Sequence, residues 1–170
     1  KWNAQWRLDV DIANVTSAYC GVNIAGPKAR DVLRKVCSDI DLSSEAFPYM
    51  GVRQGTVAGI AARVIRVGFV GELGYEVHVP QHCGEALWDA LIEAGAEQGI
   101  KPFGIEAQRV LRLEKGHIII GQDTDAMSTP AEVQMSWAIA RQKPFFVGSR
   151  SIQELDKLPA KRSLVGFVVD

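Results

Sequence analysis

The chain has 170 residues, of which 47% are apolar and 23% are charged, and its formal net charge is -1. This length and composition are typical of one globular domain, or slightly more, with enough apolar residues for a core. The near-neutral charge argues against a nucleic-acid partner, and no apolar run reaches the roughly 18 residues of a membrane-spanning helix, so we expect neither partner.

Three cysteines, Cys20, Cys37 and Cys83, are odd in number and irregularly spaced. This pattern predicts reduced thiols in a cytoplasmic protein rather than a disulfide framework. The first residues lack the apolar stretch of a signal peptide. The chain has no initiator Met and closes on the apolar run 164–169. A strand ending there would expose unpaired backbone groups, so we expect an excised piece of a longer polypeptide.

The first half of the chain predicts two strands around a helix. Residues 5–15 predict a short strand or lead-in, and residues 19–25 a buried strand. Gly26-Pro27 then begins a helix, because the fixed φ of proline suits the first helical position. A loop with Pro48 follows over residues 39–50, and a short strand over residues 54–59.

A β-hairpin is the central prediction. Residues 62–69 and 75–79 alternate between apolar and polar side chains, and Gly71-Glu72-Leu73-Gly74 lies between them. Gly68, Gly71 and Gly74 let the backbone turn tightly, or let a flat ligand approach it. Their spacing is not G-x-G-x-x-G, and no strand-then-helix context surrounds them, so no dinucleotide site is predicted.

Glu76 is the candidate functional residue of this hairpin. It shares one strand face with His78, whereas Tyr75, Val77 and Val79 share the other. A carboxylate in an apolar strand either lies on a solvated sheet face or accepts hydrogen bonds from a flat, donor-rich heterocycle. The periodicity of the strand is compatible with both interpretations.

Two helices follow. Residues 81–98 are amphipathic and stop at Gly99. The order strand, helix, strand, strand, helix predicts an α+β fold with a ferredoxin-like split β-α-β unit. Residues 104–115 predict a second helix, on which Gln108, Arg112 and Lys115 share a face that is either salt-bridged and solvated or aimed at an anion. Residues 118–120 form a short buried segment, 123–130 a polar loop, 130–142 a further helix, and 144–148 a turn.

Other constellations do not support a site. His78, His82 and Cys83 are interrupted by Pro80 and lack a fourth ligand, so no metal is expected. No G-x-S-x-G elbow is present, and no serine or cysteine has the partners of a nucleophile, so no catalytic residue is predicted within the chain.

Four ordered motifs resemble the folate-binding aminomethyltransferase family, which includes the glycine cleavage T-protein and the folate domains of sarcosine oxidase and dimethylglycine dehydrogenase. The hairpin resembles R-x-G-(F/Y)-x-G-E-x-G-(Y/F)-E. Residues 26–33 resemble G-P-x-A-x-x-(V/L)-L, and residues 111–116 resemble L-R-L-E-x-G. Residues 121–148 resemble G-x-D, T-P, W, K and F-I-G in that order. Residues 114–117 and 121–125 are most similar to the α subunits of heterotetrameric sarcosine oxidases.

The resemblance implies a tetrahydrofolate site. Glu76 matches the glutamate that accepts hydrogen bonds from the pterin edge, and Phe69 matches an aromatic residue that flanks the folate. Arg112 matches the arginine of L-R-L-E, and His117 replaces an aromatic residue as a group that can stack. Where the family has A-R-D, with an arginine reaching the folate tail, the chain has Gln108 and then Arg109.

The resemblance also implies a domain organisation and a reaction. Residues 1–160 would be part of the folate-binding domain, and residues 161–170 the start of a truncated C-terminal β-barrel domain. The catalytic aspartate of the family precedes residue 1. The parent would form 5,10-methylenetetrahydrofolate, with other subunits of a sarcosine oxidase-like complex or an aminomethyl carrier as partners and with flavin or NAD only in other parts. The isolated fragment would be inactive, and a non-catalytic folate-binding or subunit-contact module is the alternative.

Overall fold

The computed structural model describes residues 2–159 and 161–168. The chain divides into two compact units, Lys1–Lys115 and Gly116–Asp170. The first unit begins with α1 (Trp2–Trp6) and the 3-10 turn η1 (Thr16–Ala18). It continues with β1 (Tyr19–Ala25), α2 (Ala29–Val36), β2 (Val52–Val57), β3 (Ile60–Ile65) and β4 (Gly74–Pro80). It ends with η2 (Gln81–Cys83), α3 (Gly84–Gly95), η3 (Ala96–Gln98) and α4 (Ile105–Lys115).

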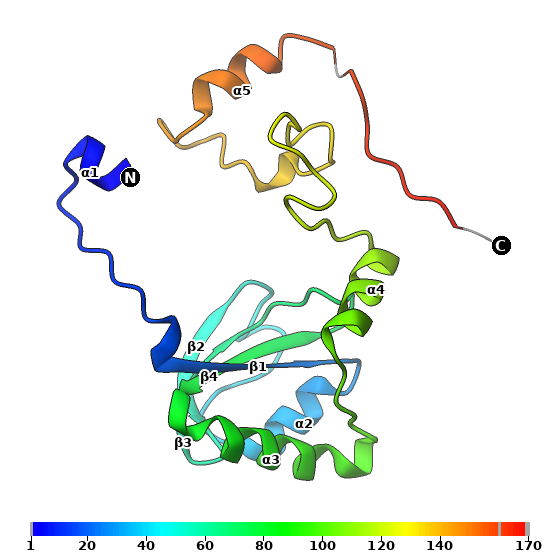
Figure 1. The fold of residues 1–170 in the computed structure, drawn as a ribbon. Coiled ribbons are helices and arrows are strands. Elements are labelled where there is room, and N and C mark those ends of the chain that lie inside the picture. Colours follow the sequence, from blue (N-terminus) through cyan, green and yellow to red (C-terminus); the bar gives the residue numbers. More distant parts are fainter. Residues whose placement is uncertain (1, 160, 169–170) are drawn as a thin grey trace. The chain divides into compact units, whose positions relative to one another are not determined.

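The four strands form one sheet in the order β1-β4-β3-β2, and every neighbouring pair is antiparallel. Helices α2 and α3 cover the same face of this sheet (Figure 1). The prediction of a mixed α+β fold is therefore confirmed. The ferredoxin-like detail is not: a split β-α-β unit needs parallel strands on either side of its helix, and β1 and β2 are related by three antiparallel steps.

The predicted pairing of the central hairpin is confirmed, with Arg63 opposite His78 and Ile65 opposite Glu76. However, β3 ends at Ile65 rather than at residue 69. The reason is that Arg66 pairs elsewhere: its N–H donates to the carbonyl of Gly51 at 3.0 Å, and its carbonyl accepts from the N–H of Met50 at 2.8 Å. Residues 66–73 thus form a loop, which we call the β3–β4 loop.

Strand β4 is fixed in the core by one of its faces. Tyr75, Val77 and Val79 are fully buried against α2 and α3. The Tyr75 ring packs at 5.8 Å from that of Phe47, and its hydroxyl accepts a hydrogen bond from Arg30 Nε at 3.1 Å. Because strand side chains alternate, this burial holds the intervening residues on the face that the helices leave open.

Other boundaries differ modestly from the predictions. The expected strand in residues 5–15 is wrong, because α1 and irregular chain occupy this region. The predicted helix over residues 81–98 is a continuous helical stretch of η2, α3 and η3, and it ends at Gly99, whose φ of 74° confirms the expected left-handed stop.

The second unit contains the 3-10 turn η4 (Ser136–Ala138) and α5 (Ser149–Leu155). The predicted helix over residues 130–142 is wrong, because Gln134 has a φ of 58°, which interrupts a right-handed helix. Within this unit, Arg162 forms ion pairs of 3.3 Å with both Asp125 and Glu132, which connect the end of the chain to its earlier segments. The Ser128 hydroxyl and the Arg162 guanidinium lower the pKa of Asp125 to about 2.

Among the described residues, no helix is long and apolar enough to cross a membrane. The expected domain boundary at residue 160 remains a prediction, and residues 160, 169 and 170 lie outside the described part of the chain.

Candidate functional site

Glu76 lies on the face of the sheet opposite α2 and α3. Its neighbours across the ladder are Asn23 on β1 and Ile65 on β3. The side chain is 42% exposed, and its Oε2 lies 3.2 Å from Nε2 of His78. Within the described part of the chain, no hydrogen bond engages the other oxygen, Oε1. Among the described residues, the carboxylate is thus held by His78 through one oxygen only.

The β3–β4 loop brings Phe69 to the same end of the sheet. This loop connects Ile65, the partner of Glu76, to the start of β4, and Phe69 is half-buried within it. Gly71 has a φ of 85°, and a Cβ there would lie 2.9 Å from Cβ of Lys115. The last turn of α4 therefore packs directly against the loop that leads into the Glu76 strand.

Arg112 lies one turn before Lys115 on α4, so the two share a helix face. It is 3% exposed, the one charged side chain classed as buried in the part of the chain that the structure describes. Burying a guanidinium is costly unless other groups compensate its charge. The solvated-face alternative does not hold at this position, and Phe69, Glu76 and Arg112 come from elements that meet at one end of the sheet.

The remaining candidates are distributed differently. Gln108 is half-buried and faces a cavity, whereas Arg109 is exposed and forms a 2.7 Å ion pair with Glu106. Gln108 therefore lines a cavity large enough for a ligand, and Arg109 does not. His117 belongs to the second unit, where it is half-buried.

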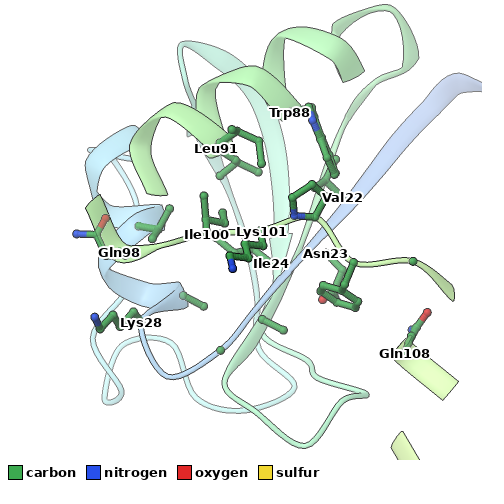
Figure 2. Close-up of a pocket in the computed structure, with 18 of the residues that line it drawn as sticks. Val22, Asn23, Ile24, Lys28, Trp88, Leu91, Gln98, Ile100, Lys101 and Gln108 are labelled. Atoms are coloured by element: carbon green, nitrogen blue, oxygen red, sulfur yellow. The ribbon is translucent and has the colours of Figure 1, made fainter. Parts of the chain in front are cut away.

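This cavity of about 730 Å³ runs beside β1. Its wall is formed by β1, α3 and the segment between η3 and α4, with Trp88, Leu91 and Ile100 as apolar contributors (Figure 2). Asn23 and Gln108 supply polar groups to the same cavity. Since Asn23 is the ladder partner of Glu76, the cavity extends to the strand neighbouring the carboxylate.

Sequence reasoning missed the cavity and Asn23. The cavity depends on β1 being an edge strand, with only β4 beside it, and strand order is not encoded in the local pattern of residues. Asn23 was detectable only as a polar residue within the apolar run 19–25. Of the described residues, no three His, Cys, Asp or Glu side chains gather in the manner of a metal site.

The comparisons with known proteins identify the class. Residues 1–143 match the family model described as GCVT N-terminal domain, and the chain belongs to this family. This confirms the resemblance inferred from the four motifs.

Individual relatives extend this result. The chain is 40% identical over 168 residues to sarcosine oxidase subunit alpha of Corynebacterium sp. (strain P-1), which covers 95% of this chain and 17% of the relative. It is 37% identical over 162 residues to the aminomethyltransferase of Chlorobaculum parvum, covering 95% of this chain and 43% of the relative. The chain thus spans less than half the length of these curated relatives.

A solved structure is similar as well. The crystal structure of the glycine cleavage system aminomethyltransferase T from Bartonella henselae has a TM-score of 0.63 and 27% identity, over 81% of this chain and 37% of that chain. Similarity in both sequence and structure therefore connects the chain with aminomethyltransferases.

Proposed function

We propose that this chain is the tetrahydrofolate-binding part of a one-carbon transferase that forms 5,10-methylenetetrahydrofolate. The observation that carries the proposal is the Glu76 carboxylate, half-exposed on the open face of the sheet, with Oε2 anchored and Oε1 without a hydrogen bond in the described part of the chain. Membership of the GCVT N-terminal domain family supports the choice of ligand.

The chemistry of Glu76 fits one edge of a pterin. The amino group and ring N–H of a pterin are adjacent donors, and a carboxylate accepts such a pair with two charge-assisted hydrogen bonds. The Glu76 carboxylate is already partly buried, so it loses less hydration on binding than a fully solvated carboxylate would. Phe69, in the loop beside Glu76, would contribute an aromatic surface for the flat ring.

The part of a folate beyond the pterin is elongated, and it needs a second binding surface on the protein. The cavity beside β1 has a volume suited to part of a small ligand, with apolar walls and few polar groups. Gln108 and Lys101 on its lining would meet the polar and anionic end of the tail. Arg112 completes the set of folate-binding residues proposed from the first unit, and His117 remains a candidate through its match to the family motif alone.

Bound tetrahydrofolate supplies two nitrogen nucleophiles, N5 and N10, that together take up a one-carbon unit. The residues of this chain bind the folate, orient these nitrogens and shield the electrophile from water. We assign no catalytic residue to the chain and propose that the proton-transferring carboxylate comes from outside it.

The donor would be an iminium or aminomethyl group produced by amine oxidation or delivered on a carrier. Partners would accordingly be other subunits of a sarcosine oxidase-like complex or an aminomethyl carrier, in the cytoplasm. Flavin or NAD would be bound by other parts of such a complex. A role in subunit contact without catalysis is the second candidate, because one relative is named as a subunit of sarcosine oxidase.

Isothermal titration calorimetry with 5-formyltetrahydrofolate tests the proposal. We expect saturable binding, and we expect a simple pterin to compete for it, because the donor edge recognised by Glu76 belongs to the pterin. Absence of binding to the intact protein, or competition by p-aminobenzoylglutamate but not by pterin, would contradict the proposal.

A further inference from the structure

His78 is the residue that engages Glu76. The two occupy positions i and i+2 of β4, so their side chains lie on the same face of the strand. Nε2 of His78 is 3.2 Å from Oε2 of Glu76. The contact is only partly shielded, since the side chains are 32% and 42% exposed.

Gly21 makes room for the imidazole. It is the ladder partner of His78 on β1, and a Cβ at this position would lie 3.1 Å from Nδ1 and 3.2 Å from Cε1 of His78. Gly21 is not among the residues with a positive φ, so the backbone does not require glycine here. What the glycine provides is space for the ring, because a Cβ at this distance would require the imidazole to shift by a few tenths of an ångström.

We propose that His78 is a positioning residue for ligand binding by Glu76. Its Nε2–H donates to Oε2, which fixes the carboxylate in one orientation, and Gly21 on the neighbouring strand keeps the place of the imidazole open. This inference rests on the proposed function of Glu76. A carboxylate has about four acceptor positions, so one hydrogen bond from His78 leaves three for a ligand.

The expected benefit lies in affinity rather than in stability. A partly exposed pair such as this one contributes little to folding. A glutamate side chain, however, loses rotamer freedom when it binds a ligand, and this loss of entropy opposes binding. If His78 fixes Glu76 before the ligand arrives, the side chain has already lost most of its rotamer freedom in the free protein, and less is lost on binding.

The test compares variants of the intact protein by calorimetric titration with 5-formyltetrahydrofolate. His78→Leu, which removes the donor, is expected to weaken binding about 3- to 10-fold. His78→Gln places an amide N–H near the position of Nε2 and is expected to stay within about 2-fold of the wild type. Gly21→Ala is expected to weaken binding as His78→Leu does, and to add nothing when His78→Leu is already present.

Wild-type affinity in His78→Leu, or equal losses in His78→Leu and His78→Gln, would overturn the positioning role. Glu76→Gln in the same series separates the two proposals. If Glu76→Gln loses affinity while His78→Leu does not, only the positioning role fails. If neither loses affinity, the proposed function fails. Thermal unfolding confirms that each variant is folded, and the comparison of His78→Leu with His78→Gln remains decisive if Gly21→Ala does not fold.

Discussion

At the scale of single residues, the structure distinguishes candidates that the sequence left equivalent. Gln108 and Arg109 are adjacent in sequence: an ungapped match to the family motif places Gln108 at the arginine position, and Arg109 follows as the residue that could serve instead. On α4 their side chains point in different directions, so Gln108 faces the cavity beside β1 and Arg109 faces solvent, where it pairs with Glu106. The rotation of the helix therefore decides which of the two can meet a ligand.

The two positions provide a matched pair of substitutions. Gln108→Ala is expected to weaken binding of 5-formyltetrahydrofolate about 3- to 10-fold, through loss of one hydrogen-bonding group. Arg109→Ala is expected to leave the affinity unchanged, because it removes only an exposed ion pair. Calorimetric titration of both variants measures the difference, and a larger loss for Arg109→Ala would show that the arginine, not the glutamine, contacts the ligand.

At the scale of elements, the alternation of residues 62–69 and 75–79 was sufficient to predict an antiparallel pair and the shared face of Glu76 and His78. It could not predict where β3 ends, because Arg66 is held by Met50 and Gly51, which precede β2 in the chain. Strand order could not be predicted either, since the paired residues of β1 and β4 are 49 to 61 positions apart and nothing in either strand specifies the other.

One side chain that joins elements should make the stability of the first unit depend on pH. Asp39 accepts hydrogen bonds from the N–H of Thr56 at 2.9 Å and from its hydroxyl at 3.0 Å, which joins the chain after α2 to β2. The Thr56 N–H, and then its hydroxyl, lower the pKa of Asp39 below its ordinary value. Because the folded pKa is the lower one, the contribution to stability is complete above the unfolded value and disappears as pH falls through the folded value.

We therefore expect Asp39→Asn to have a lower melting temperature than the wild type at pH 7, and the difference to shrink in acid, below an ordinary aspartate pKa of about 3.9. Thermal melts of both proteins between pH 7 and pH 2.5 measure this. Thr56→Val, which removes only the hydroxyl, should show a smaller effect of the same sign. A difference that grows as pH falls would contradict the assignment.

At the scale of the whole molecule, the two units differ in how they are stabilised. The first unit has an apolar core that includes Leu33, Phe47, Tyr75 and Leu87, all fully buried. In the second unit, none of the described side chains is buried, and ion pairs such as that of Arg141 with Asp156 connect its segments. Exposed ion pairs contribute little to folding, so most of the stability should reside in the first unit.

This difference predicts the behaviour of the separate units. Residues 1–115 expressed alone should unfold cooperatively on heating, as followed by circular dichroism, because their core is complete within that range. Residues 116–170 expressed alone should show no cooperative transition. A sharp transition for the second unit by itself would mean that it has a source of stability beyond exposed ion pairs.

Sequence motifs identified the family and placed Glu76, Phe69 and Arg112 among the candidates, and the structure brings their elements together at one end of the sheet. The cavity, Asn23 and the room that Gly21 gives His78 depend on contacts between β1 and β4. Such contacts arise only when the chain has folded, and so they were beyond sequence reasoning.

The central claim is that Glu76 recognises the pterin edge, and Glu76→Gln in the intact protein tests it most directly. The substitution keeps the shape of the side chain but turns one acceptor into a donor that faces other donors. Loss of a charge-assisted pair should cost roughly 2 to 4 kcal/mol, on the order of 30- to 1,000-fold in affinity for 5-formyltetrahydrofolate by calorimetric titration. Glu72→Gln, in the exposed part of the β3–β4 loop, is the matched control and should bind as the wild type does. Equal, small losses for the two variants would show that Glu76 is a solvated strand residue without a role in binding.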